Sequence, residues 1–162
     1  MTSTITPNEL YELQIAVDVE AGRTIGAALS VARYRYTEAD TPPAGEEFAQ
    51  ELLSLHARDL ARATDALPLG ERPAGWDTPP EDVEDPWAVS TARFDVVRAA
   101  MTAARYDFTT PTMTVPEAQR ARRRLALAAR QLAHIVDGQA AHNQPMGWDE
   151  PADTAWWRQG CC

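Results

Sequence analysis

The sequence matches itself when it is shifted by 72 positions, and the match needs no gap. Arg33-Tyr34 recurs as Arg105-Tyr106, and Gly75-Trp76-Asp77 recurs as Gly147-Trp148-Asp149. Many alanine and leucine positions between these anchors also match. Self-similarity at a fixed period indicates one structural unit that is present twice. Any fold assigned to this chain must therefore accommodate two similar units in succession.

Within each unit, apolar residues return every three or four positions, which is the period of an amphipathic α-helix. The first stripe, for example, runs through Leu13, Val17 and Ala21. Prolines separate the stripes, because proline is poorly tolerated inside a helix. Four helices are predicted, over residues 7–36, 44–66, 85–108 and 115–137.

The boundaries of the helices also carry recognisable signals. Thr6 and Glu9 have the spacing of a capping box, and Gly138 is typical of a helix C-terminus. Gly22 and Gly26 interrupt the first helix, and each costs about 1 kcal/mol relative to alanine. We therefore expect these two glycines to mark a close helix crossing or a kink.

No segment alternates between polar and apolar residues as a half-buried strand would, so the chain is predicted to be all-α. We expect two tandem helical hairpins, packed as a pseudo-two-fold antiparallel four-helix bundle, with a Pro-, Gly- and Trp-rich loop after each hairpin. A solenoid-like stack of the hairpins is the alternative. The bundle is favoured because each hairpin needs a partner for its apolar face. One domain is expected over residues 1–162, with repeats at about 7–84 and 85–155 and a tail at 156–162.

The formal net charge of −9 argues against general nucleic-acid binding, because phosphate contacts need a basic surface. Residues 1–86 hold 17 acidic side chains and 6 arginines, whereas residues 87–162 hold 7 acidic side chains and 9 arginines. The two units therefore differ in charge. All 15 basic residues are arginines, which excludes Schiff-base and P-loop lysine chemistry.

Composition also sets expectations about origin and location. An alanine-rich chain without lysine is typical of a GC-rich genome, and we expect a bacterial protein. The N-terminal residues lack the features of a signal peptide, and no apolar run reaches the roughly 18 residues of a membrane span. We therefore predict a cytoplasmic protein without a transmembrane segment.

The Gly-Trp-Asp motif follows each hairpin and permits two interpretations. In the structural one, glycine allows a turn, tryptophan covers the end of the core and aspartate bonds local backbone N–H groups. In the functional one, the motif binds a partner, because tryptophan is favoured at binding hot spots. The candidate partner-binding residues are Trp76, Asp77, Trp148 and Asp149.

A cluster of arginines occupies the first turns of the last predicted helix, at Arg120, Arg122, Arg123 and Arg124. Positive charge is unfavourable there against the helix dipole, so we expect something to offset it. Ion pairs with the acidic first unit would do so. An anionic partner or an acidic protein surface would do so as well, and these arginines are therefore candidate partner-binding residues.

Metal-binding patterns are weak. The three histidines form no Glu-x-x-His pair and no zinc spacing, and His56 is interpreted as a core or surface residue. Four carboxylates offer ligands for a bundle site, namely Glu20, Glu47, Glu51 and Asp59. Their counterparts 72 residues later are not acids, so a symmetric two-metal centre is not expected. No cofactor is identified.

The only two thiols, Cys161 and Cys162, are adjacent and terminal. Adjacent cysteines can form a strained disulfide, bind a soft metal together with another chain, or accept a covalent group. They are a candidate thiol site.

These patterns favour a non-enzymatic interaction or accessory protein that binds another protein through the Trp-containing loops and the Arg-rich helix start. The alternative is a thiol- or metal-dependent function at Cys161 and Cys162, as a redox carrier or as the substrate of a modifying enzyme. A third hypothesis places ligand or enzyme chemistry in a pocket between the hairpins. No catalytic motif is present to support an enzyme, and a homo-oligomer stays open.

Overall fold

The computed structural model describes residues 4–36, 43–108 and 115–150, and all regular structure in these ranges is helical. The four α-helices are α1 (Pro7–Tyr36), α2 (Pro43–Asp65), α3 (Ala88–Phe108) and α4 (Val115–Asp137). Short 3-10 turns follow α2 at Leu69–Glu71 and α4 at Ala141–Asn143. The four predicted helices are therefore confirmed, to within three residues at each end. None of them is long and apolar enough to cross a membrane.

The start of α1 is the predicted capping box. The backbone N–H of Thr6 donates to Glu9 Oε2 over 2.7 Å, and the backbone N–H of Glu9 donates to Thr6 Oγ1 over 3.2 Å. These hydrogen bonds favour the ionised carboxylate and lower the pKa of Glu9 below its usual value. The spacing of Thr6 and Glu9 therefore predicts the start of this helix correctly.

The first of the two expectations for the glycines of α1, a close helix crossing, is wrong. Gly22 and Gly26 are exposed, and no neighbouring atom lies within 4 Å of the position that a Cβ would take at either residue. Neither therefore marks a close helix crossing, and α1 runs through both without a break.

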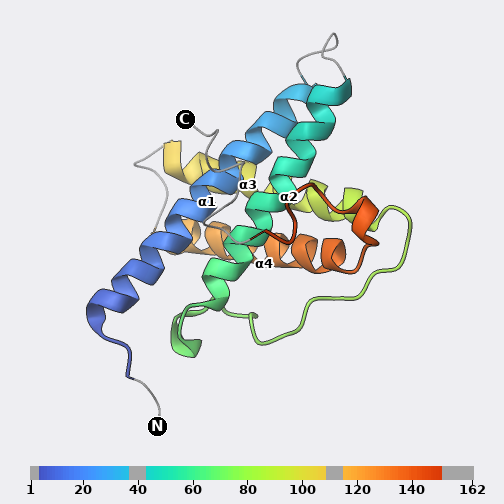
Figure 1. The fold of residues 1–162 in the computed structure, drawn as a ribbon. Helices are drawn as coiled ribbons and strands as arrows, with labels where there is room; N and C mark the ends of the chain where they lie inside the picture. The colour runs from blue at the N-terminus through green and yellow to red at the C-terminus, as the bar shows by residue number, and fades with distance from the viewer. Residues whose placement is uncertain (1–3, 37–42, 109–114, 151–162) are drawn as a thin grey trace.

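The helices form two hairpins that pack on each other as a bundle. α1 packs against α2, and α3 packs against α4; between the hairpins, α2 contacts α4 and α1 contacts α3. The α1–α2 hairpin crosses the α3–α4 hairpin obliquely, and the first turns of α1 extend beyond the other helices (Figure 1). The predicted all-α bundle of two hairpins is thus confirmed.

The core between the hairpins is built from small and medium residues at matching positions. Ala57 and Ala129 are fully buried, and so are Ala28 and Ala100. Alanine at these positions lets helix backbones approach closely, while leucines fill the remaining space at Leu53, Leu60, Leu125 and Leu132. These pairs are each 72 residues apart, which agrees with the expected pseudo-symmetry; an origin by duplication stays a prediction.

Candidate binding site

Both Gly-Trp-Asp loops contain the same turn. Gly75 has a φ of +92° and Gly147 a φ of +83°, a region of backbone conformation that only glycine enters without strain. The backbone N–H of Trp76 donates to the carbonyl of Pro73, and that of Trp148 donates to the carbonyl of Pro145. The glycine therefore sets the direction in which each tryptophan leaves the loop.

Each tryptophan packs against the end of its own hairpin and hydrogen-bonds to it. The rings of Trp76 and Trp148 are only 2% and 3% exposed. Trp76 Nε1 donates to Asp65 Oδ1 over 2.8 Å, and Trp148 Nε1 donates to Asp137 Oδ1 over 2.6 Å. Asp65 and Asp137 are the last residues of α2 and α4, so each loop folds back onto the helix that precedes it.

Each loop is also held by an arginine of the opposite hairpin. Arg130 on α4 donates to the carbonyls of Trp76 (2.6 Å) and Thr78 (3.1 Å), and its guanidinium carbon lies 4.5 Å from the centroid of the Trp76 ring. Arg58 on α2 donates to the carbonyl of Trp148 and stacks 5.0 Å from the centroid of that ring. The loop after α2 accordingly runs beside α4, and the loop after α4 returns over α2 (Figure 1).

The four loop residues proposed as partner contacts therefore fall into two groups. The indoles of Trp76 and Trp148 are buried, hydrogen-bonded and stacked on arginine. The carboxylates of Asp77 and Asp149 face solvent. This arrangement supports the structural interpretation of the tryptophans.

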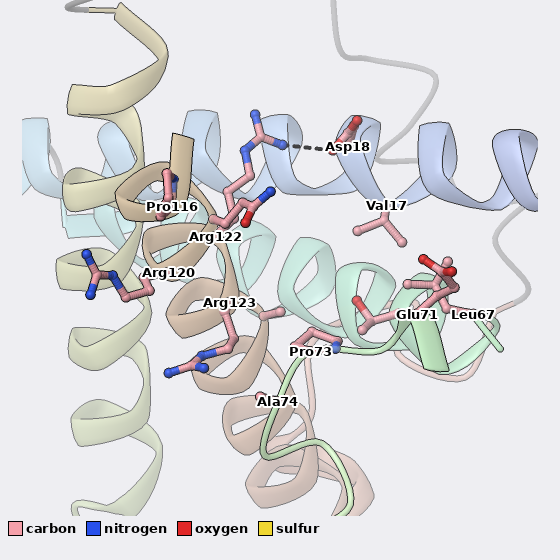
Figure 2. A pocket seen from close by; sticks show the side chains of 13 residues that line it. Val17, Asp18, Leu67, Glu71, Pro73, Ala74, Pro116, Arg120, Arg122 and Arg123 are labelled. Atoms are coloured by element: carbon pink, nitrogen blue, oxygen red, sulfur yellow. Dashed lines mark hydrogen bonds and ion pairs between the residues drawn. The ribbon is translucent and has the colours of Figure 1, made fainter. Parts of the chain in front are cut away.

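A cavity of about 650 Å³ lies where the start of α4 meets α1 and the loop after α2. Its apolar walls include Val17 of α1, Leu67 after α2 and Ala126 of α4, and Ala74 lies at its edge (Figure 2). Ligand pockets typically have volumes of about 300–1,000 Å³, so this cavity is large enough to receive side chains or a small molecule.

Three of the four predicted arginines line this cavity. Arg122 Nη1 reaches Asp18 Oδ1 of α1 over 2.9 Å, which offsets its charge at the N-terminus of α4 (Figure 2). Among the described residues, Arg123 Nε is buried without a hydrogen-bond partner, and Arg120 lines both this cavity and a hollow between α3 and α4. Arg124 instead lines hollows between α3 and α4. Arg120, Arg122 and Arg123 therefore all line one apolar cavity, and their guanidinium groups point in different directions (Figure 2).

A second polar group lies inside the bundle, away from this cavity. Glu20 of α1 and His56 and Asp59 of α2 are all buried, and each offers a ligand atom within 4.8 Å of the other two. Thr24 Oγ1 hydrogen-bonds the carbonyls of Glu20 (2.8 Å) and His56 (3.1 Å), so it holds α1 and α2 together beside the group.

Spacing rules for metal sites did not reveal this group. They look for a glutamate three residues before a histidine, whereas here Asp59 follows His56 by three residues. The third residue, Glu20, lies on α1. Helical periodicity predicts which face of α1 carries Glu20, but it does not predict which residues of α2 pack against it. The candidate thiol site at Cys161 and Cys162 lies outside the described residues.

The comparisons with known proteins add no relative. No family model matches the chain, and no curated protein or solved structure matches it either. Any function must therefore be argued from the residues themselves.

Proposed function

We propose that this protein is a non-enzymatic interaction protein, and that it binds an acidic segment of another protein in the Arg-lined cavity between α1, α4 and the loop after α2. In this proposal an apolar side chain of the segment enters the cavity, and flanking carboxylates contact Arg120 and Arg123. The observation that carries the proposal is the presence of three arginines in the lining of one open apolar cavity.

The charges at the cavity favour an acidic partner on balance, because three arginines line it against the two carboxylates of Asp18 and Glu71. Arg122 is already paired with Asp18, whereas Arg123 presents a buried Nε–H that no described residue accepts. A buried donor without an acceptor carries a desolvation cost of about 1–3 kcal/mol. A partner carboxylate that reaches the guanidinium of Arg123 would form a charge-assisted hydrogen bond, which is stronger than a neutral one.

The walls of the cavity support an apolar anchor beside those carboxylates. Val17, Leu67 and Ala126 offer aliphatic surface, and Pro73 adds a rigid edge. Binding energy at protein interfaces is concentrated in a few side chains that fill such hollows. The tryptophans of the two loops serve the scaffold in this proposal, since their rings are buried.

Selection from a displayed library of random peptides tests the proposal directly, because the natural partner need not be identified first. We expect the selected peptides to combine aspartate or glutamate with a leucine or phenylalanine. Arg123→Gln should weaken the binding of a selected peptide about 10-fold, the effect of losing roughly 1.4 kcal/mol. Fluorescence anisotropy with the labelled peptide measures both dissociation constants.

Matched controls are available within the chain. Arg124→Gln makes the same change one residue further along α4, outside the cavity, and should change the affinity less than about two-fold. Ala74→Met narrows the cavity with the residue that the second loop carries at the equivalent position, Met146, and should weaken binding. Selected peptides that lack acidic residues, or that bind the Arg123→Gln and Ala74→Met variants unchanged, would refute the proposal.

A further inference from the structure

The buried group of Glu20, His56 and Asp59 has the chemistry of a metal site. His56 and Asp59 are three residues apart on α2 and therefore lie on one face of the helix. Glu20 approaches them from α1, and the ligand atoms of all three residues lie within 4.8 Å of one another. One imidazole and two carboxylates are ligands that zinc and other first-row divalent ions accept.

The second hairpin provides an internal control for these three positions. Shifted by 72 residues, Glu20, His56 and Asp59 correspond to alanine, alanine and glutamine, at Ala92, Ala128 and Gln131. The α3–α4 pair packs without any ionisable group at these positions, so the helical hairpin does not need them. In the first hairpin Glu20 and Asp59 are each paired with an arginine, and all three ionisable groups are nevertheless gathered at one buried point.

The geometry points to a binding site for one divalent first-row transition ion, held by Glu20, His56 and Asp59 between α1 and α2. The site is separate from the Arg-lined cavity and does not depend on the function proposed there. Three protein ligands leave one position of a tetrahedral zinc ion for a water molecule or for a second carboxylate oxygen.

The neighbouring arginines are compatible with such an ion. Arg23 Nη1 contacts Glu20 Oε1 over 3.0 Å, and Arg58 Nη2 contacts Asp59 Oδ1 over 3.2 Å. Ligation through Glu20 Oε2 and Asp59 Oδ2 would keep both ion pairs, which then orient the carboxylates in the way that outer-shell hydrogen bonds orient metal ligands. Arg23 is partly exposed.

Zinc binding to the chelator-treated full chain tests the site. We expect one zinc ion per chain by isothermal titration calorimetry. At a zinc concentration roughly 100 times the dissociation constant, the melting temperature should rise by about 5–10 °C. The triple variant Glu20→Ala/His56→Ala/Asp59→Gln, which copies the second hairpin, should keep the fold and lose both effects.

A second variant keeps the test decisive if the triple variant does not fold. His134 and His142 lie on the surface, so the double variant His134→Gln/His142→Gln retains His56 as its only histidine. Replacing both terminal cysteines with serine removes the only thiols. In this combined variant, cobalt(II) should bind one per chain and produce paramagnetically shifted NMR signals from a single imidazole.

Three results would overturn the inference. The first is that the wild-type chain binds no stoichiometric zinc. The second is that the triple variant folds and still binds zinc with unchanged affinity. The third is that metal binding disappears from the variant in which His56 is the only histidine, because the metal would then be held by the surface histidines or the thiols.

Discussion

At the scale of single residues, Arg58 and Arg130 make equivalent contacts in different surroundings. Each donates to a tryptophan carbonyl of the opposite hairpin and stacks on that indole ring. Arg58 is 1% exposed and also pairs with the buried Asp59, whereas Arg130 is partly exposed and is followed by Gln131. Desolvation lowers the pKa of Arg58 below its usual value.

This difference predicts unequal costs for the same substitution. Arg58→Met should destabilise the fold by about 3–5 kcal/mol, because it leaves a buried carboxylate without its ion pair. Arg130→Met removes hydrogen bonds to carbonyls that water can partly reach, and should cost about 1–2 kcal/mol. Urea unfolding of the two variants measures both values.

The Asp59→Gln background isolates the cause of that difference. It gives Arg58 the same neighbour that Arg130 has, so the cost of Arg58→Met should fall to about that of Arg130→Met. Equal costs in the wild-type background would contradict the explanation.

At the scale of elements, α1 and the two loops use glycine for opposite reasons. Gly22 and Gly26 stand on an exposed helix face with open space around them, whereas Gly75 and Gly147 adopt a positive φ. The glycines of α1 therefore weaken the helix without making a contact, and those of the loops are required by the turn. Sequence spacing placed all four in the correct elements but did not separate these roles, because the role depends on what packs beside the residue.

Alanine substitution should change the stability of the protein in opposite directions for the two kinds of glycine. Gly22→Ala and Gly26→Ala should each stabilise the protein by about 0.5–1 kcal/mol, since alanine is a better helix former and meets no neighbour. Gly75→Ala and Gly147→Ala should each destabilise it by about 1–2 kcal/mol, because an L side chain is strained at these φ values. Thermal unfolding followed by circular dichroism gives the four shifts, and a destabilised Gly22→Ala variant would show that the face is covered.

At the scale of the whole molecule, the two loops hold the hairpins together. Local sequence signals predict each hairpin but not the contacts between them. The helices could be predicted because capping and periodicity act over a few residues. The contact between Arg58 and Trp148 spans 90 residues and that between Arg130 and Trp76 spans 54, and no local rule connects positions so far apart. The sequence predicts the run of arginines and, as a separate hypothesis, a pocket between the hairpins, but it does not place the two together, since the walls of the Arg-lined cavity come from separate segments.

Each loop docks on an arginine of the opposite hairpin. We therefore predict that neither half of the chain folds fully by itself. Fragments 1–84 and 85–162 should each show much less helix than their share of the intact protein, because each lacks the arginine that holds its loop. An equimolar mixture should regain the helical signal and elute as a one-to-one complex. Circular dichroism and size-exclusion chromatography with light scattering measure these outcomes.

The tryptophan contacts provide the control for that experiment. Trp148→Ala in the second fragment should weaken the complex at least about 10-fold, because it removes the ring that stacks on Arg58. Fragments that fold fully by themselves, or that associate equally well without Trp148, would contradict the role given to the loops.

The docking of each loop on the opposite hairpin also has a consequence for the order of folding. A loop cannot complete its docking until the opposite hairpin presents its arginine, so we expect closure of both loops to be a late step, after the helices have paired. Contacts that form after the transition state act on the rate of unfolding and leave the rate of folding nearly unchanged. We therefore expect the two tryptophan loops to govern how long the native state persists once it has formed.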